Sequence, residues 1–143
     1  MTLRPFAEFK SDIVDYTLEE TEFDEFVAAN GLVHATAIIE MLRRPDRVID
    51  EPELVEPGGR WQFHVRTKAR TFFFQVQLMY DVFLHTEDAT WPRFLGRLHT
   101  PQLAEVLEEL NEALQRDPRF HDIKWCAKHE IFGGGPGAPT PRG

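Results

Sequence analysis

The alternation of apolar residues between Arg60 and Thr86 constrains the fold of this chain more than any other feature. From Phe72 to Leu84 every even-numbered residue is apolar or aromatic. The odd-numbered positions mix apolar and polar side chains, namely Phe73, Gln75, Gln77, Met79, Asp81, Phe83 and His85. A period of two is typical of a β-strand, because successive side chains point to opposite faces of a sheet. We therefore predict one strand over 72–84.

A helix is the competing interpretation, since part of this run also fits a helical stripe. The helix would place Phe74, Leu78 and Val82 on its polar face, and the β-branched and aromatic content favours a strand. At about 3.3 Å per residue the strand would be about 40 Å long, which exceeds the usual strand length. We expect it to bend, to bulge or to pair with different neighbours along its length.

A second alternating segment lies just upstream. Trp61, Phe63 and Val65 alternate with Gln62, His64 and Arg66, which predicts another strand. The polar link 67–70 is short, so the two strands are predicted to form a long aromatic hairpin. The link contains no Asn-Gly or Asp-Gly pair, and its sequence therefore does not specify the register of the hairpin.

The rest of the chain contains helix and strand patterns on both sides of the hairpin. A capping box of Thr17 and Glu20 begins a predicted helix. The clearest helix follows Thr100 and carries one apolar stripe, formed by Leu103, Val106, Leu107, Leu110 and Leu114. Segment 32–44 fits either a helix or a strand. A final strand is predicted over 123–131.

These elements predict an α+β fold. The expected architecture is a single two-layer domain over 1–132, with an antiparallel sheet and its long aromatic hairpin packed against two to three helices. Residues 133–143 are rich in glycine and proline and have little apolar surface to bury. We predict a flexible tail there.

From the composition we expect a cytoplasmic protein. The lone cysteine, Cys126, excludes an internal disulfide and fits a reducing compartment. The N-terminal residues lack the apolar core of a signal peptide. No apolar stretch approaches the roughly 20 residues that cross a bilayer, so we expect no membrane partner.

Charge is distributed unevenly along the chain, whose net charge is −8. Residues 1–56 carry 5 basic and 14 acidic side chains, whereas residues 57–100 carry 6 basic and 3 acidic ones. An acidic protein is poorly suited to contact a nucleic-acid backbone over a broad surface, so we do not expect a nucleic-acid partner. The acidic half fits a basic protein partner, although such charge runs are usually ordinary solvated faces.

Short catalytic and metal-binding motifs are absent from the sequence. It contains no phosphate loop, nucleophile elbow, zinc-protease helix, paired CxxC or EF-hand loop. His121, Cys126 and His129 are close in sequence, but on one strand Cys126 would face away from the two histidines. Zinc needs three or four converging ligands. We therefore predict neither a metal site nor a cofactor.

One cluster supports an enzymatic alternative. His64, Arg66 and Arg70, with His85 at the end of the next strand, combine a general acid–base with cations that stabilise negative charge. Such groups suit a small phosphodiesterase or RNase-like enzyme. Arg70 lies in the turn, however, so convergence with His85 is geometrically doubtful. The simpler interpretation is a solvated polar face.

Binding of another protein is the favoured class of function. If helices cover the even face of the sheet, the aromatic and apolar residues Phe73, Met79 and Phe83 stay exposed on the odd face, as at partner-binding sites. The second part of the predicted surface is acidic and comprises Glu19, Glu20, Glu22, Asp24 and Glu25. This profile suits an inhibitor or immunity-type protein, or a chaperone or adaptor. A homodimer and a structural subunit of a larger particle are the other interpretations.

Overall fold

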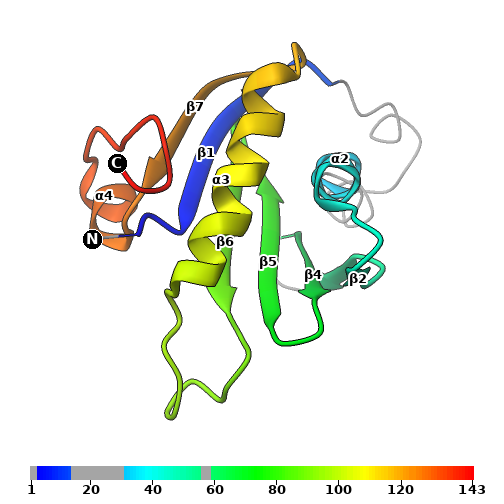
Figure 1. Cartoon of the computed structure of the whole chain (residues 1–143). Helices are drawn as coiled ribbons and strands as arrows, with labels where there is room; N and C mark the ends of the chain where they lie inside the picture. Colours follow the sequence, from blue (N-terminus) through cyan, green and yellow to red (C-terminus); the bar gives the residue numbers. More distant parts are fainter. Residues whose placement is uncertain (1–2, 14–30, 56–58) are drawn as a thin grey trace.

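The computed structural model describes residues 3–13, 31–55 and 59–143 (Figure 1). Its strands are β1 (Phe6–Ser11), β2 (Val48–Ile49), β3 (Glu53–Val55), β4 (Arg60–Arg66), β5 (Thr71–Leu78), β6 (Val82–Asp88) and β7 (Phe120–Cys126). Its helices are α2 (Leu32–Leu42), α3 (Pro101–Arg116) and α4 (Lys128–Gly133).

The strands of the described residues form one seven-stranded sheet. Its order is β2-β4-β5-β6-β1-β7, β3 also pairs with β4, and every pairing is antiparallel. Helices α2 and α3 lie against one face of this sheet (Figure 1). The predicted α+β class is therefore confirmed.

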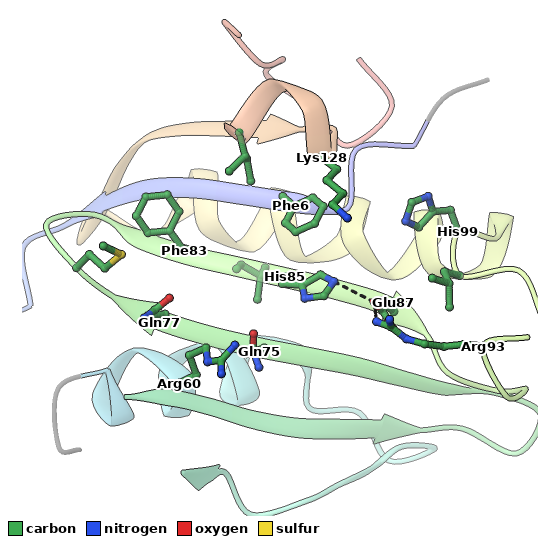
Figure 2. A pocket seen from close by; sticks show the side chains of 14 residues that line it. Phe6, Arg60, Gln75, Gln77, Phe83, His85, Glu87, Arg93, His99 and Lys128 are labelled. Atoms are coloured by element: carbon green, nitrogen blue, oxygen red, sulfur yellow. Dashed lines mark hydrogen bonds and ion pairs between the residues drawn. The ribbon is translucent and has the colours of Figure 1, made fainter. Parts of the chain in front are cut away.

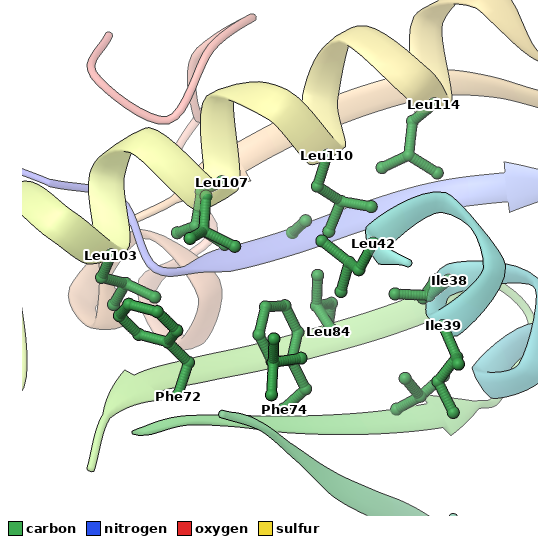
Figure 3. Packing of buried hydrophobic residues seen from close by; sticks show 14 of the residues in the cluster. Ile38, Ile39, Leu42, Phe72, Phe74, Leu84, Leu103, Leu107, Leu110 and Leu114 are labelled. Carbon is green, nitrogen blue, oxygen red and sulfur yellow. The ribbon is translucent and has the colours of Figure 1, made fainter. Parts of the chain in front are cut away.

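The hydrophobic core lies between α2, α3 and the even-numbered residues of β5 and β6 (Figure 3). All of its largest members are almost fully buried, among them Ile38, Leu42, Phe63, Phe72, Phe74, Leu84, Leu103, Leu107, Leu110 and Leu114. The rings of Phe63 and Phe74 stack with centroids 5.4 Å apart. Every second residue of the strands thus packs against the apolar stripes of the two helices, and together they form one core layer.

The predicted single strand over 72–84 is wrong, although its first part pairs with β4 across the link 67–70. Strand β5 ends at Leu78, and the chain turns through residues 79–81 and returns as β6. The Met79 amide donates to the Asp81 carbonyl across 3.0 Å, and Tyr80 at the apex is fully exposed. Leu78 pairs directly with Val82, so both point to the same face. A three-residue turn therefore preserves even-numbered burial, and the alternation continues across it unbroken.

Segment 32–44, which the sequence leaves open between helix and strand, contains helix α2. Its buried residues are His34, Ala35, Ile38, Ile39 and Leu42. The helix begins after Gly31, whose φ of 111° is a conformation that favours glycine. A Cβ at Gly31 would also lie 3.3 Å from the Trp61 ring, so close packing against β4 requires a glycine there.

Helix α3 confirms the clearest helical pattern of the sequence. The Thr100 hydroxyl accepts from the Leu103 amide at 3.2 Å, and Pro101 occupies the first turn. The side-chain oxygen of Asn111 accepts a hydrogen bond from the buried Trp125 indole at 2.8 Å, which joins α3 to β7. Satisfying a buried indole N–H in this way avoids the cost of an unpaired donor.

The final strand is shorter than predicted. Strand β7 ends at Cys126, and the predicted strand residues 128–131 belong to helix α4 instead. The Glu130 carboxylate accepts from the Ala127 amide at 2.9 Å and from Arg4 at 2.9 Å. A glutamate at the third helical position that reaches back to the capping residue stabilises a helix start, which alternation alone does not reveal.

Residues 134–143 run back along the body of the protein. Ala138 and Trp125 exchange two backbone hydrogen bonds of 2.7 and 2.8 Å, Arg142 pairs with Glu108, and the Arg4 amide donates to Pro141 at 2.8 Å. The flexibility of this tail and the boundary at 132 stay predictions.

Candidate functional site

The sheet face opposite α2 and α3 carries the odd-numbered side chains of β5 and β6, and we call it the open face. Register places Gln75 beside His85 and Gln77 beside Phe83, while Phe6 of β1 pairs with His85 from the other side. These five residues are half-buried, in contrast to the buried residues Phe74, Val76, Val82 and Leu84 of β5 and β6. The open face is therefore where the sheet presents polar and aromatic groups together.

A row of rings crosses the open face over four strands. Phe6 of β1 stacks on His85 of β6 with centroids 4.7 Å apart and planes 11° apart. His85 meets Phe73 of β5 edge-on at 5.7 Å, and Phe73 contacts His64 of β4 at 5.7 Å. We call Phe6, His85, Phe73 and His64 the aromatic row. It gives this face a continuous aromatic surface formed by residues that are distant in sequence.

A cleft of about 550 Å³ opens over Phe6 and His85, at one end of the aromatic row (Figure 2). Helix α4 supplies Lys128 and Ile131 on one side, and the loop 89–99 between β6 and α3 supplies Arg93, Leu98 and His99. The sheet contributes the remaining lining residues, namely Phe6, Arg60, Gln75, Gln77, Met79, Phe83, Leu84, His85 and Glu87. Its volume lies in the range of ligand sites, roughly 300–1,000 Å³.

The cleft has an excess of positive charge. Glu87 is the one carboxylate among its lining residues, and it already pairs with His85, whose Nε2 lies 3.1 Å from Oε1, and with Arg93. Within the described part of the chain, no hydrogen bond or ion pair involves the Lys128 ammonium or the Arg60 guanidinium. The Nε of Arg60 is buried without a partner.

His85 lies at the centre of the cleft and favours its neutral form. Burial, the largest cause, lowers the pKa of His85, and the positive charges of Arg93 and His99 lower it further. The ion pair with Glu87 opposes this by raising the pKa. A neutral imidazole offers an aromatic face as well as a hydrogen-bonding nitrogen.

The residues of the predicted catalytic cluster do not converge. His64 and Arg66 both bind Asp50, with His64 Nδ1 3.0 Å from its carboxylate. Burial raises the pKa of Asp50, but the hydrogen bonds from Arg66 and His64 outweigh it and lower that pKa. Phe73 lies between His64 and His85 in the aromatic row.

Arg70, the fourth residue of that cluster, belongs to a different network. It pairs with Asp88 at 3.2 Å, and this carboxylate is buried at the end of β6. Asp88 also accepts from the Thr100 and Thr90 hydroxyls at 2.5 Å each. Arg70 therefore helps to join β5, β6 and the start of α3, on the side of the sheet away from the cleft.

The apolar residues of the predicted binding surface lie at or beside the cleft. Phe83 and the 62% exposed Met79 line it, and Phe73 belongs to the aromatic row. The acidic part of that prediction, which comprises Glu19, Glu20, Glu22, Asp24 and Glu25, lies outside the described residues. The structure thus places one half of the predicted surface and leaves the other as a prediction.

Several cleft residues were missed because they lie outside any strand pattern. Lys128 belongs to α4, where a strand was predicted, and Arg93 and His99 lie in a loop without periodicity. Arg60 was considered only as the first residue of the aromatic run. Its even-numbered position on β4, on the face opposite the apolar Trp61, Phe63 and Val65, is the signal that could have found it, and the structure pairs it with the odd-numbered Gln77 of β5.

The loop 89–99 exposes a cluster of large apolar side chains. Trp91, Phe94 and Leu95 are 62%, 85% and 71% exposed, and the loop extends beyond the end of the sheet (Figure 1). A second hollow of about 330 Å³ lies between this loop and Phe73 and shares Glu87, Arg93 and Leu98 with the cleft. The loop contains two arginines and no acidic residue. It therefore continues the cationic, aromatic character of the open face.

The described ranges show neither a metal-binding cluster nor a membrane-spanning helix. These residues contain no group of three or more histidine, cysteine, aspartate or glutamate side chains placed to hold a metal ion. No helix among them is both long and apolar enough to span a bilayer.

The chain matches no protein-family model, no curated protein and no solved structure.

Proposed function

We propose that the protein acts by binding another protein, and that the open face, its cleft and the loop 89–99 form the binding surface. The observation that carries this proposal is the continuity of the aromatic row with the exposed loop, through the hollow beside Phe73. Aromatic and arginine side chains around a hollow are the usual composition of energetically important interface positions. The expected partner presents an apolar segment that also carries negative charge.

Charge supports this choice of partner. The expectation from sequence was a basic partner for the acidic residues 19–25, which lie outside the described residues. The cleft and the loop instead carry Arg60, Arg93, Arg97 and Lys128 against the single carboxylate of Glu87. Complementary charge selects partners and speeds their encounter. An inhibitor, an immunity-type protein and a chaperone or adaptor would each use such a surface, and the cytoplasmic location stays a prediction.

Selection from a random peptide library tests the proposal without assuming a natural partner. The wild-type chain should enrich a recurrent apolar and acidic sequence, and the double variant Phe94→Ser, Leu95→Ser should lose that enrichment. The matched control is Leu32→Ser, Val33→Ser, two exposed apolar residues on α2. Equal enrichment by both double variants, or no recurrent sequence with the wild type, would contradict the proposal.

One observation favours a phosphodiesterase as the second candidate. His85 and Glu87 form a histidine–carboxylate pair inside a cationic cleft, an arrangement that can serve general acid–base catalysis. The previously predicted partners Arg66 and Arg70 are bound to Asp50 and Asp88 instead. Hydrolysis of a fluorogenic RNA that disappears in His85→Ala would place this candidate first. Light scattering that shows a large, concentration-independent oligomer would favour the assembly subunit.

A further inference from the structure

We propose that the cleft is a pocket for a carboxylate with an aromatic or aliphatic group beside it, such as an aspartate or glutamate next to an apolar residue in a partner segment. This inference deepens the proposed function and rests on it for the identity of the natural ligand. The pocket combines an apolar floor with two cations, Arg60 and Lys128, whose side chains pair with no other described residue. Each half of this combination comes from a different part of the cleft.

The first half is the pair of unpaired cations on opposite sides of the pocket. Arg60 extends from β4 and Lys128 from α4, with Gln75 and the Phe6–His85 stack between these two elements (Figure 2). The carboxylate of Glu87 pairs with Arg93 and His85 rather than with either of these two cations. A partly buried guanidinium whose Nε has no acceptor favours an incoming anion over any cation.

The second half is the apolar floor. The stacked rings of Phe6 and His85, together with Phe83 and Ile131, provide a surface for a planar or branched hydrocarbon group. Burial lowers the pKa of His85 and so favours the neutral imidazole, which suits this role because covering an imidazolium with hydrocarbon would cost its hydration. A ligand with only the anion, or only the hydrocarbon, would use half of the pocket.

Binding of a carboxylate should also change the pKa of His85. The charged groups around it are Glu87 on β6, Arg93 and His99 on the loop, Arg60 on β4 and Lys128 on α4. A bound carboxylate adds negative charge to this set and stabilises the imidazolium form. The pKa of His85 should therefore rise on binding, whereas a neutral ligand of the same shape should leave it unchanged.

The test is an NMR titration of the full chain with 3-phenylpropionate, 3-phenylpropanamide and 3-phenylpropylammonium. The carboxylate should bind most tightly, perturb Phe6, Gln75 and His85, and raise the pKa of the His85 imidazole. Arg60→Gln should weaken it about tenfold, because it removes a charge-assisted bond to a partly buried group. Lys128→Gln should weaken it about threefold, because that ammonium is exposed.

Arg116→Gln is the control variant, since this exposed arginine lies at the end of α3 and pairs only with the neighbouring Glu112. Equal binding of the carboxylate and its amide by the wild type would overturn the inference, and so would unchanged affinity in Arg60→Gln. Tighter binding of phenyl phosphate than of 3-phenylpropionate would overturn the choice of a carboxylate. The wild-type ligand series stands even if a variant fails to fold.

The pocket and the proposed function fail in different ways. If peptide selection enriches sequences that need Phe94 and Leu95 but have no acidic residue, and 3-phenylpropionate does not bind, the pocket is wrong while protein binding stands. If 3-phenylpropionate binds and no peptide is enriched, the proposed function is wrong while the pocket stands.

Discussion

The two faces of the sheet are built from the same strands but are completed in different ways. On β5 the even-numbered Phe72, Phe74 and Val76 are at most 2% exposed beneath α2 and α3, whereas the odd-numbered Phe73 and Gln75 stay half-buried on the open face. On the covered side Asp88 accepts hydrogen bonds from Arg70, Thr90 and Thr100. Each side also has one buried donor without a partner, the Nε of Arg60 on the open face and the indole N–H of Trp61 on the covered face.

This difference separates the residues that stabilise the fold from those that are available for binding. A covered face lowers the free energy through burial and close packing. An unpaired buried donor lowers stability and is tolerated where function needs it. The comparison therefore predicts that substitutions on the covered face change stability, and that substitutions on the open face change binding.

The largest effect should come from Phe74→Ala. This ring is fully buried and stacks on Phe63, so its removal should lower the free energy of unfolding by about 3–5 kcal/mol. The matched change on the open face, Phe73→Ala, should cost about 1 kcal/mol. Urea denaturation of both variants measures the difference. Equal losses would mean that the open face is part of the core.

Asp88→Ala should have the next largest effect. The change removes the acceptor of Thr90, Thr100 and Arg70, and leaves the O–H of the buried Thr100 without an acceptor at the start of α3. We expect a loss of about 2–3 kcal/mol, measured by the same denaturation. Glu112→Ala on the exposed side of α3 serves as the control and should change little. A loss no greater than that of the control would contradict the role of Asp88 in joining β6 to α3.

The Asp50 cluster should give a smaller, pH-dependent effect. Its hydrogen bonds from Arg66 and His64 lower the pKa of Asp50 in the folded state. The folded chain therefore binds this proton less readily than the unfolded chain, and the stabilisation is present above the unfolded pKa and lost as pH falls through the folded pKa. The stability difference between wild type and Asp50→Asn should shrink between pH 7 and pH 3. A difference that is constant with pH would show that the cluster is not electrostatic.

Arg60→Gln should have the smallest effect on stability. The change removes an unpaired cation from a positive cleft, so the free energy of unfolding should stay within about 0.5 kcal/mol of wild type or rise slightly. Denaturation measures this, and the ligand titration on the same sample shows whether binding falls. A large loss of stability would mean that Arg60 is structural, which would remove the contrast between the two faces.

Sequence periodicity predicted burial better than it predicted chain direction. The even-numbered residues from Phe72 to Leu84 were correctly assigned to one face except for Tyr80, which is exposed at the apex of the turn 79–81. That turn could not be seen in the sequence because three residues preserve the alternation. The helix α3 was predictable because its cap and its stripe agree. Helix α4 was not, because the capping position is held by Ala127, which is not a typical capping residue, and because the apolar alternation of β7 continues into the helix.

The candidate site was only partly predictable for a related reason. Phe83 and His85 could be assigned to an uncovered face from alternation alone, since their neighbours form the core. Arg93 and Lys128 come from a loop and a misassigned segment, and only the fold brings them to the same cleft. Charge along the chain indicated a basic region without showing that Arg66 and Arg70 are bound to acids and that Arg60 is not.

The most direct test of the account is an NMR map of the full chain with a peptide from the library selection. We predict the largest chemical-shift changes at Gln75, Phe83 and His85 and along the loop 89–99. The signals of the covered residues of β5 and of the outer side of α3 should stay nearly unchanged. Changes confined to the outer sides of α2 and α3, or to residues 14–30, would contradict the assignment of binding to the open face.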